Sequence, residues 1–141
     1  ECTTFVRSLG ARQKHRHALI IAVGKYSAGI KDLPNAVRDG ESLKESLEAL
    51  GWVVTLRIDA TREEARKALK AFIDECEEHE DAVLFAFFGH GIERRTTMQQ
   101  YLVMSNTVIS DEAENEADFC KLLNRTCVNL QEQLIKLGMN R

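Results

Sequence analysis

The feature that most constrains the fold is an uninterrupted apolar run over residues 82–88, which leads directly into Gly89, His90 and Gly91. Seven consecutive apolar residues leave no polar face, so the run predicts a strand that is buried on both sides. Such a strand needs helices on both faces of its sheet, which is typical of parallel α/β proteins. The rest of the chain therefore has to supply amphipathic helices.

The segments before this run alternate between strand and helix patterns. Residues 17–23 and 52–58 are rich in β-branched and aliphatic residues and predict two further strands. Residues 35–50 carry apolar side chains at helical spacing, and Thr61 and Glu64 form a capping box that opens a second helix. The order strand, helix, strand, helix, strand predicts an α/β fold with a largely parallel sheet flanked by helices.

The segment after the run is less regular. Residues 92–100 are polar and predict a loop, whereas residues 101–104 predict a short strand. The acidic stretch 110–118 reads as a solvated connection rather than a binding site. Apolar residues then recur at helical spacing from Cys127 to Leu137, which predicts a last helix.

Length and charge narrow the class of protein. A chain of 141 residues fits a single domain, of which residues 1–16 form a lead-in and residues 17–138 the patterned core. The net charge of −3 favours neither nucleic acid nor an acidic membrane surface as a partner. We expect no membrane span and no signal peptide, and hence a cytoplasmic protein. Glu1 in place of a methionine suggests that the sequence is cut from something longer.

The four cysteines do not have the spacing of a metal site. Cys2, Cys76, Cys120 and Cys127 form no C-x-x-C pair, and no histidines stand at zinc-ligand intervals. Cys76 falls on the apolar stripe of the second predicted helix, where a free cysteine is typically core. We therefore expect no metal site.

His90 is the candidate for chemistry. In open parallel sheets ligands collect beyond the carboxyl ends of the strands, and His90 follows such an end. An imidazole can accept and return a proton near neutral pH. The sequence has no G-x-S-x-G turn that would supply a serine nucleophile.

Several segments together resemble a known family. The stretches HALIIAVGKY, LPNAVRDGESLKESLEALGWVV, AVLFAFFGHGIE and YLVMSN, with a threonine-capped helix between the second and third, are similar to the large-subunit region of caspase-like cysteine peptidases. The pattern is closest to the paracaspase and metacaspase branches. The resemblance spans about residues 18–138.

The resemblance implies roles for two residues. His90 would be the histidine of a Cys-His dyad, and the backbone N–H of Gly91 would help to hold the oxyanion. In the family the nucleophilic cysteine follows the next strand, about 50 residues after the histidine. Cys120 and Cys127 are too close and lie in helical patterns, so we expect the strand and its cysteine to lie beyond Arg141. The domain would then be incomplete at its C-terminal end and inactive alone.

The resemblance also places an acidic residue, Asp39, in the pocket for the residue before the cut bond. A carboxylate there would favour arginine or lysine. A second interpretation is that Asp39 only favours the positive end of the predicted helix in its first turn. Because Arg38 is adjacent, a shift of one residue in the pairing would reverse the charge of the pocket.

The resemblance implies a cysteine endopeptidase that hydrolyses peptide bonds through an acyl-enzyme, with polypeptide substrates. A second copy, or the missing C-terminal part of the domain, is an additional candidate partner. No organic cofactor is expected; calcium enters only by analogy with metacaspases, and the sequence lacks a calcium-loop pattern. The main alternative is a catalytically inactive caspase-like scaffold. A doubly wound ligand-binding domain is a third option, but the loop after the first strand lacks a G-x-G-x-x-G spacing.

Overall fold

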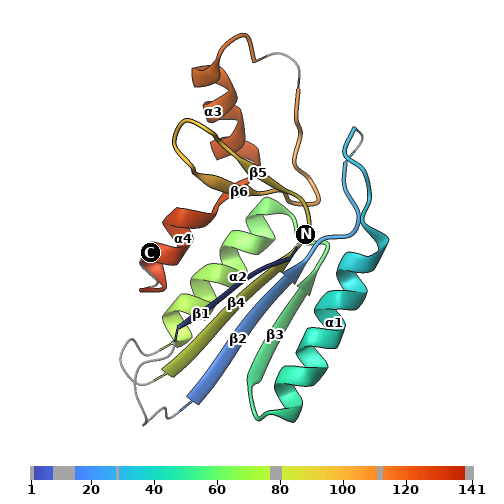
Figure 1. The fold of residues 1–141 in the computed structure, drawn as a ribbon, viewed down its shortest axis with the longest axis vertical. Helices are drawn as coiled ribbons and strands as arrows, with labels where there is room; N and C mark the ends of the chain where they lie inside the picture. The colour runs from blue at the N-terminus through green and yellow to red at the C-terminus, as the bar shows by residue number, and fades with distance from the viewer. Residues whose placement is uncertain (1, 8–14, 28, 77–80, 111–112, 139–141) are drawn as a thin grey trace.

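The computed structural model describes residues 2–7, 15–27, 29–76, 81–110 and 113–138. Figure 1 shows a main sheet accompanied by two long helices, with a hairpin and a further helix beyond the tips of β2 and β3. In chain order the elements are β1 (Cys2–Arg7), β2 (His15–Ala22), α1 (Pro34–Ala49), β3 (Val53–Ile58), α2 (Arg62–Glu75), β4 (Asp81–Phe88), β5 (Gly91–Glu93), β6 (Gln100–Leu102), α3 (Glu116–Thr126), β7 (Val128–Asn129) and α4 (Leu130–Lys136).

The main sheet has the strand order β1-β4-β2-β3. Strand β2 pairs in parallel with both β3 and β4, and β1 pairs antiparallel with the outer side of β4. The sheet is therefore mixed but mostly parallel and is flanked by helices, as the sequence predicts. The carboxyl ends of β2, β3 and β4 consequently meet at one edge.

Both faces of the sheet are buried, which accounts for the continuous apolar runs. On β2, Leu19 and Ile21 belong to a core shared with α2 and α4, whereas Ile20 and Ala22 belong to a core shared with α1. Successive side chains of a strand point to opposite faces, so a strand covered on both sides must be apolar throughout. Helices α1 and α2 thus lie on opposite faces of the sheet.

The predicted helix signals are confirmed. Helix α1 begins at Pro34, one residue before the predicted start, and Gly51 follows its end with φ of +84°, as expected of a C-terminal cap. The capping box of α2 forms with both of its bonds: Thr61 accepts from the N–H of Glu64, and the Glu64 carboxylate accepts from the N–H of Thr61.

The structure adds elements that the sequence analysis did not assign. Strand β1 lies in the supposed lead-in, and β5 lies at the start of the segment interpreted as a loop. The interpretation of residues 110–118 as a solvated connection is also wrong in part, because α3 begins at Glu116 with Asn115 as its N-cap. Strands β5, β6 and β7 form a second, small sheet in the order β5-β6-β7. No helix in the described parts of the chain is both long and apolar enough to cross a membrane.

Candidate active site

His90 lies just beyond β4, at the carboxyl edge of the main sheet, and is partly exposed. The backbone N–H of His90 donates to the Tyr26 hydroxyl at 2.8 Å, and the two rings lie 4.9 Å apart. The imidazole Nε2 lies 2.7 Å from the carbonyl oxygen of Lys31. Since a carbonyl only accepts, Nε2 carries the proton in this contact, and Nδ1 of the neutral ring is left as the basic nitrogen.

Gly89 makes this arrangement possible because the Tyr26 hydroxyl comes very close to it. A Cβ atom at residue 89 would lie 2.5 Å from that hydroxyl and 2.7 Å from the Phe87 ring. Atoms do not approach so closely, so a larger residue would displace Tyr26 or the strand end. The first glycine of the Gly-His-Gly sequence is therefore required for packing against Tyr26.

The loop that carries Tyr26 and Lys31 is anchored by Asp59 at the end of β3. One carboxylate oxygen of Asp59 accepts from the N–H groups of Gly24 and Lys25, at 2.8 and 3.0 Å. Asp59 itself has φ of 51°, a left-handed conformation that aspartate tolerates better than most residues. The loop after β2 is thus fixed by β3, and it in turn positions the groups that contact His90.

Tyr26 is neutral at any ordinary pH. Burial raises the pKa of its hydroxyl to about 12; the hydrogen bond from the His90 backbone opposes this rise, and the nearby Asp59 carboxylate adds to it. A protonated phenol can accept from the His90 N–H and still donate elsewhere. The hydroxyl therefore serves as a fixed support beside the imidazole and not as an acid or base.

The backbone N–H of Gly91 points away from the neighbouring strand. Val103 N–H donates to the His90 carbonyl at 3.0 Å, and Arg94 N–H donates to the Gln99 carbonyl at 2.9 Å. Hydrogen-bonded and non-hydrogen-bonded pairs alternate along an antiparallel ladder, so the Gly91 pair with Leu102 is non-hydrogen-bonded. Since β5 is an edge strand among the described residues, the Gly91 N–H is free to donate to a ligand.

Asp39 lines a cavity of about 230 Å³ at the same edge of the sheet. The cavity is lined by Cys2, Leu33, Pro34, Asn35, Ala36, Asp39 and Phe88. Arg38 is not among the lining residues. The reading of Asp39 as a first-turn helix residue is wrong, because α1 begins at Pro34 and has no acidic residue in its first turn.

Cys2 is brought to this cavity by the pairing of β1 with β4, in which Cys2 lies opposite Phe88. Its side chain is exposed. The sequence carries no signal for this placement, because the pairing joins the two ends of a long stretch of chain and no local pattern specifies it.

Cys127 is unsuited to act as a nucleophile. It is 1% exposed, and burial raises the pKa of its thiol, so the reactive thiolate is disfavoured. Its sulfur lies 3.9 Å from the Thr107 hydroxyl and 3.8 Å from that of Thr126. Cys127 is a core residue at the end of α3.

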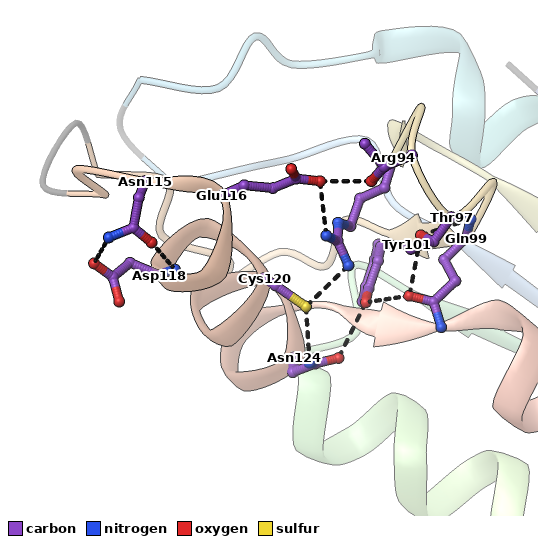
Figure 2. Close-up of polar contacts among 10 residues, drawn as sticks. Arg94, Thr97, Gln99, Tyr101, Asn115, Glu116, Asp118, Cys120 and Asn124 are labelled. Carbon is purple, nitrogen blue, oxygen red and sulfur yellow. Dashed lines mark hydrogen bonds and ion pairs between the residues drawn. The ribbon is translucent and has the colours of Figure 1, made fainter.

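Cys120 belongs to a separate polar cluster, drawn in Figure 2. Its sulfur accepts from Arg94 Nη1 at 3.1 Å and from Asn124 Nδ2 at 3.5 Å. Arg94 also pairs with Glu116 at 3.0 Å, and the Tyr101 hydroxyl donates to Asn124. These contacts fasten α3 to the β5–β6 hairpin, and none of the described contacts joins Cys120 to His90.

The described residues contain no group of three or more histidine, cysteine, aspartate or glutamate side chains that could hold a metal ion. Tyr26, Lys31 and Asp59 are the site residues that sequence reasoning did not assign. Tyr26 lies within one of the stretches that carry the family resemblance, which was the only signal for it. The contact of Lys31 is made by its backbone, so its residue type gives no signal.

The chain was compared with protein-family models and with the curated proteins. A protein-family model described as the caspase domain matches residues 15–134, which is most of the chain. None of the curated proteins matches it.

Proposed function

The chain belongs to the caspase-domain family, and from this premise we propose that it is the histidine-bearing part of a cysteine endopeptidase. Membership of this family suggests a function like that of a cysteine peptidase. The proposal adds the dyad histidine His90, an oxyanion donor at Gly91 and a specificity residue, Asp39. The paracaspase and metacaspase branches are the ones whose sequence pattern this chain resembles.

The observation that carries the proposal is the contact of His90 Nε2 with the Lys31 carbonyl. It supports a fixed ring orientation with Nδ1 as the base. In the proposed reaction Nδ1 takes the proton of a cysteine thiol, and the thiolate attacks the peptide carbonyl. The Gly91 N–H stabilises the oxyanion, His90 returns the proton to the leaving amine, and water then hydrolyses the acyl-enzyme.

The nucleophile has to approach His90 from a neighbouring strand. Strand β4 has two sides, of which β2 takes one and β1 the other. We propose that a cysteine outside the present sequence supplies the thiol, on a strand that pairs with β4 where β1 now lies. The burial of Cys127 and the Arg94 contact of Cys120 favour this choice over either of them.

Asp39 supports cleavage after arginine or lysine. Its carboxylate lines the cavity next to Phe88, two residues before His90, so a bound basic side chain would place its carbonyl near the imidazole. The proposed substrates are polypeptides, the proposed location is the cytoplasm, and no organic cofactor enters the chemistry.

The test uses the chain extended in its parent reading frame past Arg141. Fluorogenic peptides that end in arginine, lysine or aspartate are compared for the parent, His90→Ala and His15→Ala. His15 is an exposed histidine at the opposite end of the sheet and serves as the matched control. We expect kcat/KM to fall about 100- to 10,000-fold in His90→Ala and to remain unchanged in His15→Ala.

Two results would overturn the proposal. One is full activity in His90→Ala. The other is loss of activity in Cys2→Ala, which would move the nucleophile from a further strand to β1. If the extended chain cleaves no peptide at all, the inactive scaffold becomes the better description of this caspase domain.

A further inference from the structure

A second cavity, of about 630 Å³, lies between α2 and α4 on the face of the main sheet opposite α1. Helix α2 runs back from the carboxyl edge of the sheet, and the lining residues belong to α2 from its second turn onward and to α4. The cavity is therefore distinct from the edge that carries His90. Its lining residues are Arg66, Lys67, Lys70, Ile73, Asp74, Gln133 and Lys136, and we call this cavity the basic groove.

The groove is strongly cationic. Four of the seven lining side chains are cations and only Asp74 is an anion. Lys70 is paired with Asp74 at 2.9 Å, and Lys136 is paired with Glu132 at 3.2 Å, but both pairs are largely solvent-exposed and hence weak. Arg66 and Lys67 are exposed and form no ion pair with any residue that the structure describes. Hydrogen bonds, the largest cause, and also Arg66 lower the pKa of the Glu63 carboxyl, but no ion pair of 4 Å or less holds Arg66 there, so both side chains can reach an anionic ligand.

Gln133 adds a neutral polar side chain to the lining of the basic groove. Gln133 is 8% exposed. It lines the basic groove and also a smaller cavity of about 170 Å³, and Arg66 likewise lines both cavities. Its side-chain amide makes no hydrogen bond to the described part of the chain. The amide atoms are not among the buried polar atoms that lack a partner, so they are accessible from the groove, and a ligand that supplies both a donor and an acceptor could bind them.

We propose that the basic groove binds an acidic polypeptide segment of a partner protein. A main-chain peptide group offers one N–H and one carbonyl, which match the two functions of the Gln133 amide. Carboxylates of the segment would pair with Arg66 and Lys67, with arginine able to form a bidentate contact. Ile73 and the aliphatic stems of the lysines provide apolar contact along the groove. This inference does not depend on peptidase activity, since binding is measured directly.

The test measures fluorescence anisotropy of a labelled peptide, Glu-Glu-Leu-Glu-Glu-Leu, and of its neutral counterpart, Gln-Gln-Leu-Gln-Gln-Leu. The protein variants are Lys67→Glu in the groove, Lys44→Glu on α1, and Gln133→Glu. Lys67→Glu and Lys44→Glu change the net charge equally but lie on opposite faces of the sheet. Gln133→Glu keeps the shape of the side chain and adds a carboxylate to the groove.

We expect the acidic peptide to bind the parent and Lys44→Glu alike, and to bind Lys67→Glu and Gln133→Glu at least about fivefold more weakly. Binding should weaken as sodium chloride is raised, and the neutral peptide should bind poorly. Equal binding by Lys67→Glu and Lys44→Glu would overturn the proposal. Groove-dependent binding of inorganic phosphate or of a single-stranded RNA, without binding of the peptide, would overturn it as well.

Discussion

The Tyr26 hydroxyl accepts a hydrogen bond from the backbone N–H of His90 at 2.8 Å, while the two rings lie 4.9 Å apart in a tilted arrangement. One side chain therefore fixes both the backbone and one side of the ring of the proposed dyad histidine. The Lys31 carbonyl fixes the ring nitrogen. The orientation of His90 thus depends on a loop that is anchored from β3.

Gly89→Ala should lower the free energy of unfolding by about 1–3 kcal/mol, because the added Cβ overlaps the Tyr26 hydroxyl and the Phe87 ring. Gly91→Ala is the matched control, since its Cβ meets only the Tyr101 carbonyl at 3.7 Å. Urea unfolding of both variants checks the difference. Similar stability for the two variants would show that Gly89 is not needed for packing.

Tyr26→Phe should remove a pH dependence of stability. The pKa of Tyr26 is about 12 in the folded protein and 10.0 unperturbed, so between these values the unfolded chain loses a proton that the folded protein retains. Stability of the parent therefore falls as the pH rises from about 10 to about 12. Urea unfolding over this range should show a smaller fall in Tyr26→Phe. Any contribution of Tyr101 to the pH dependence is common to both proteins and cancels in the comparison. Parallel curves of stability against pH would contradict the assignment of this dependence to Tyr26.

Asp59→Ala should destabilise the protein by about 2–3 kcal/mol, because two N–H groups lose a charged acceptor and alanine is strained at positive φ. Asp59→Asn should cost about 1 kcal/mol, since asparagine tolerates this conformation and keeps an acceptor oxygen. Thermal unfolding of the two variants gives the comparison. An equal loss in both would indicate that charge, and not geometry, anchors the loop.

Asp39→Asn should change the specificity of the proposed peptidase. Loss of a charged partner for the substrate side chain is expected to cost about 2 kcal/mol, or about 30-fold in kcat/KM, for arginine-ended peptides. The control is Glu41→Gln, because Glu41 is exposed on the same helix and does not line the cavity. An unchanged preference in Asp39→Asn would remove this residue from the pocket.

Cys127 should resist alkylation in the folded protein. Its thiol is buried with a raised pKa, whereas that of Cys2 is exposed. Iodoacetamide labelling followed by peptide mass spectrometry should show early modification of Cys2, with Cys127 modified only after unfolding in urea. Labelling of Cys127 as fast as Cys2 would show that the end of α3 opens readily.

The main sheet and its two long helices were predictable because their signals are local. The apolar run of β4 requires cover on both faces, Gly51 marks the end of α1, and the capping box of Thr61 and Glu64 marks the start of α2. Strand β1 and helix α3 were missed for a physical reason. Pairing of β1 depends on a partner far away in the sequence, and the charged start of α3 resembles a solvated loop until its N-cap, Asn115, is considered.

The sequence by itself determined the α/β class and the place of His90 after a buried strand, because hydrophobic periodicity and short motifs are properties of neighbouring residues. The family of the domain also followed from the sequence, through its resemblance to known proteins and not through periodicity. The tertiary structure alone decided which groups surround that histidine. Tyr26 lies 64 positions and Lys31 59 positions away from it, and Asp59 fixes the course of their loop from another strand. Likewise, Arg66 and Gln133 face one groove only because α2 and α4 pack on the same side of the sheet. Contacts between distant segments are set by the packing of the whole core, which no local pattern encodes.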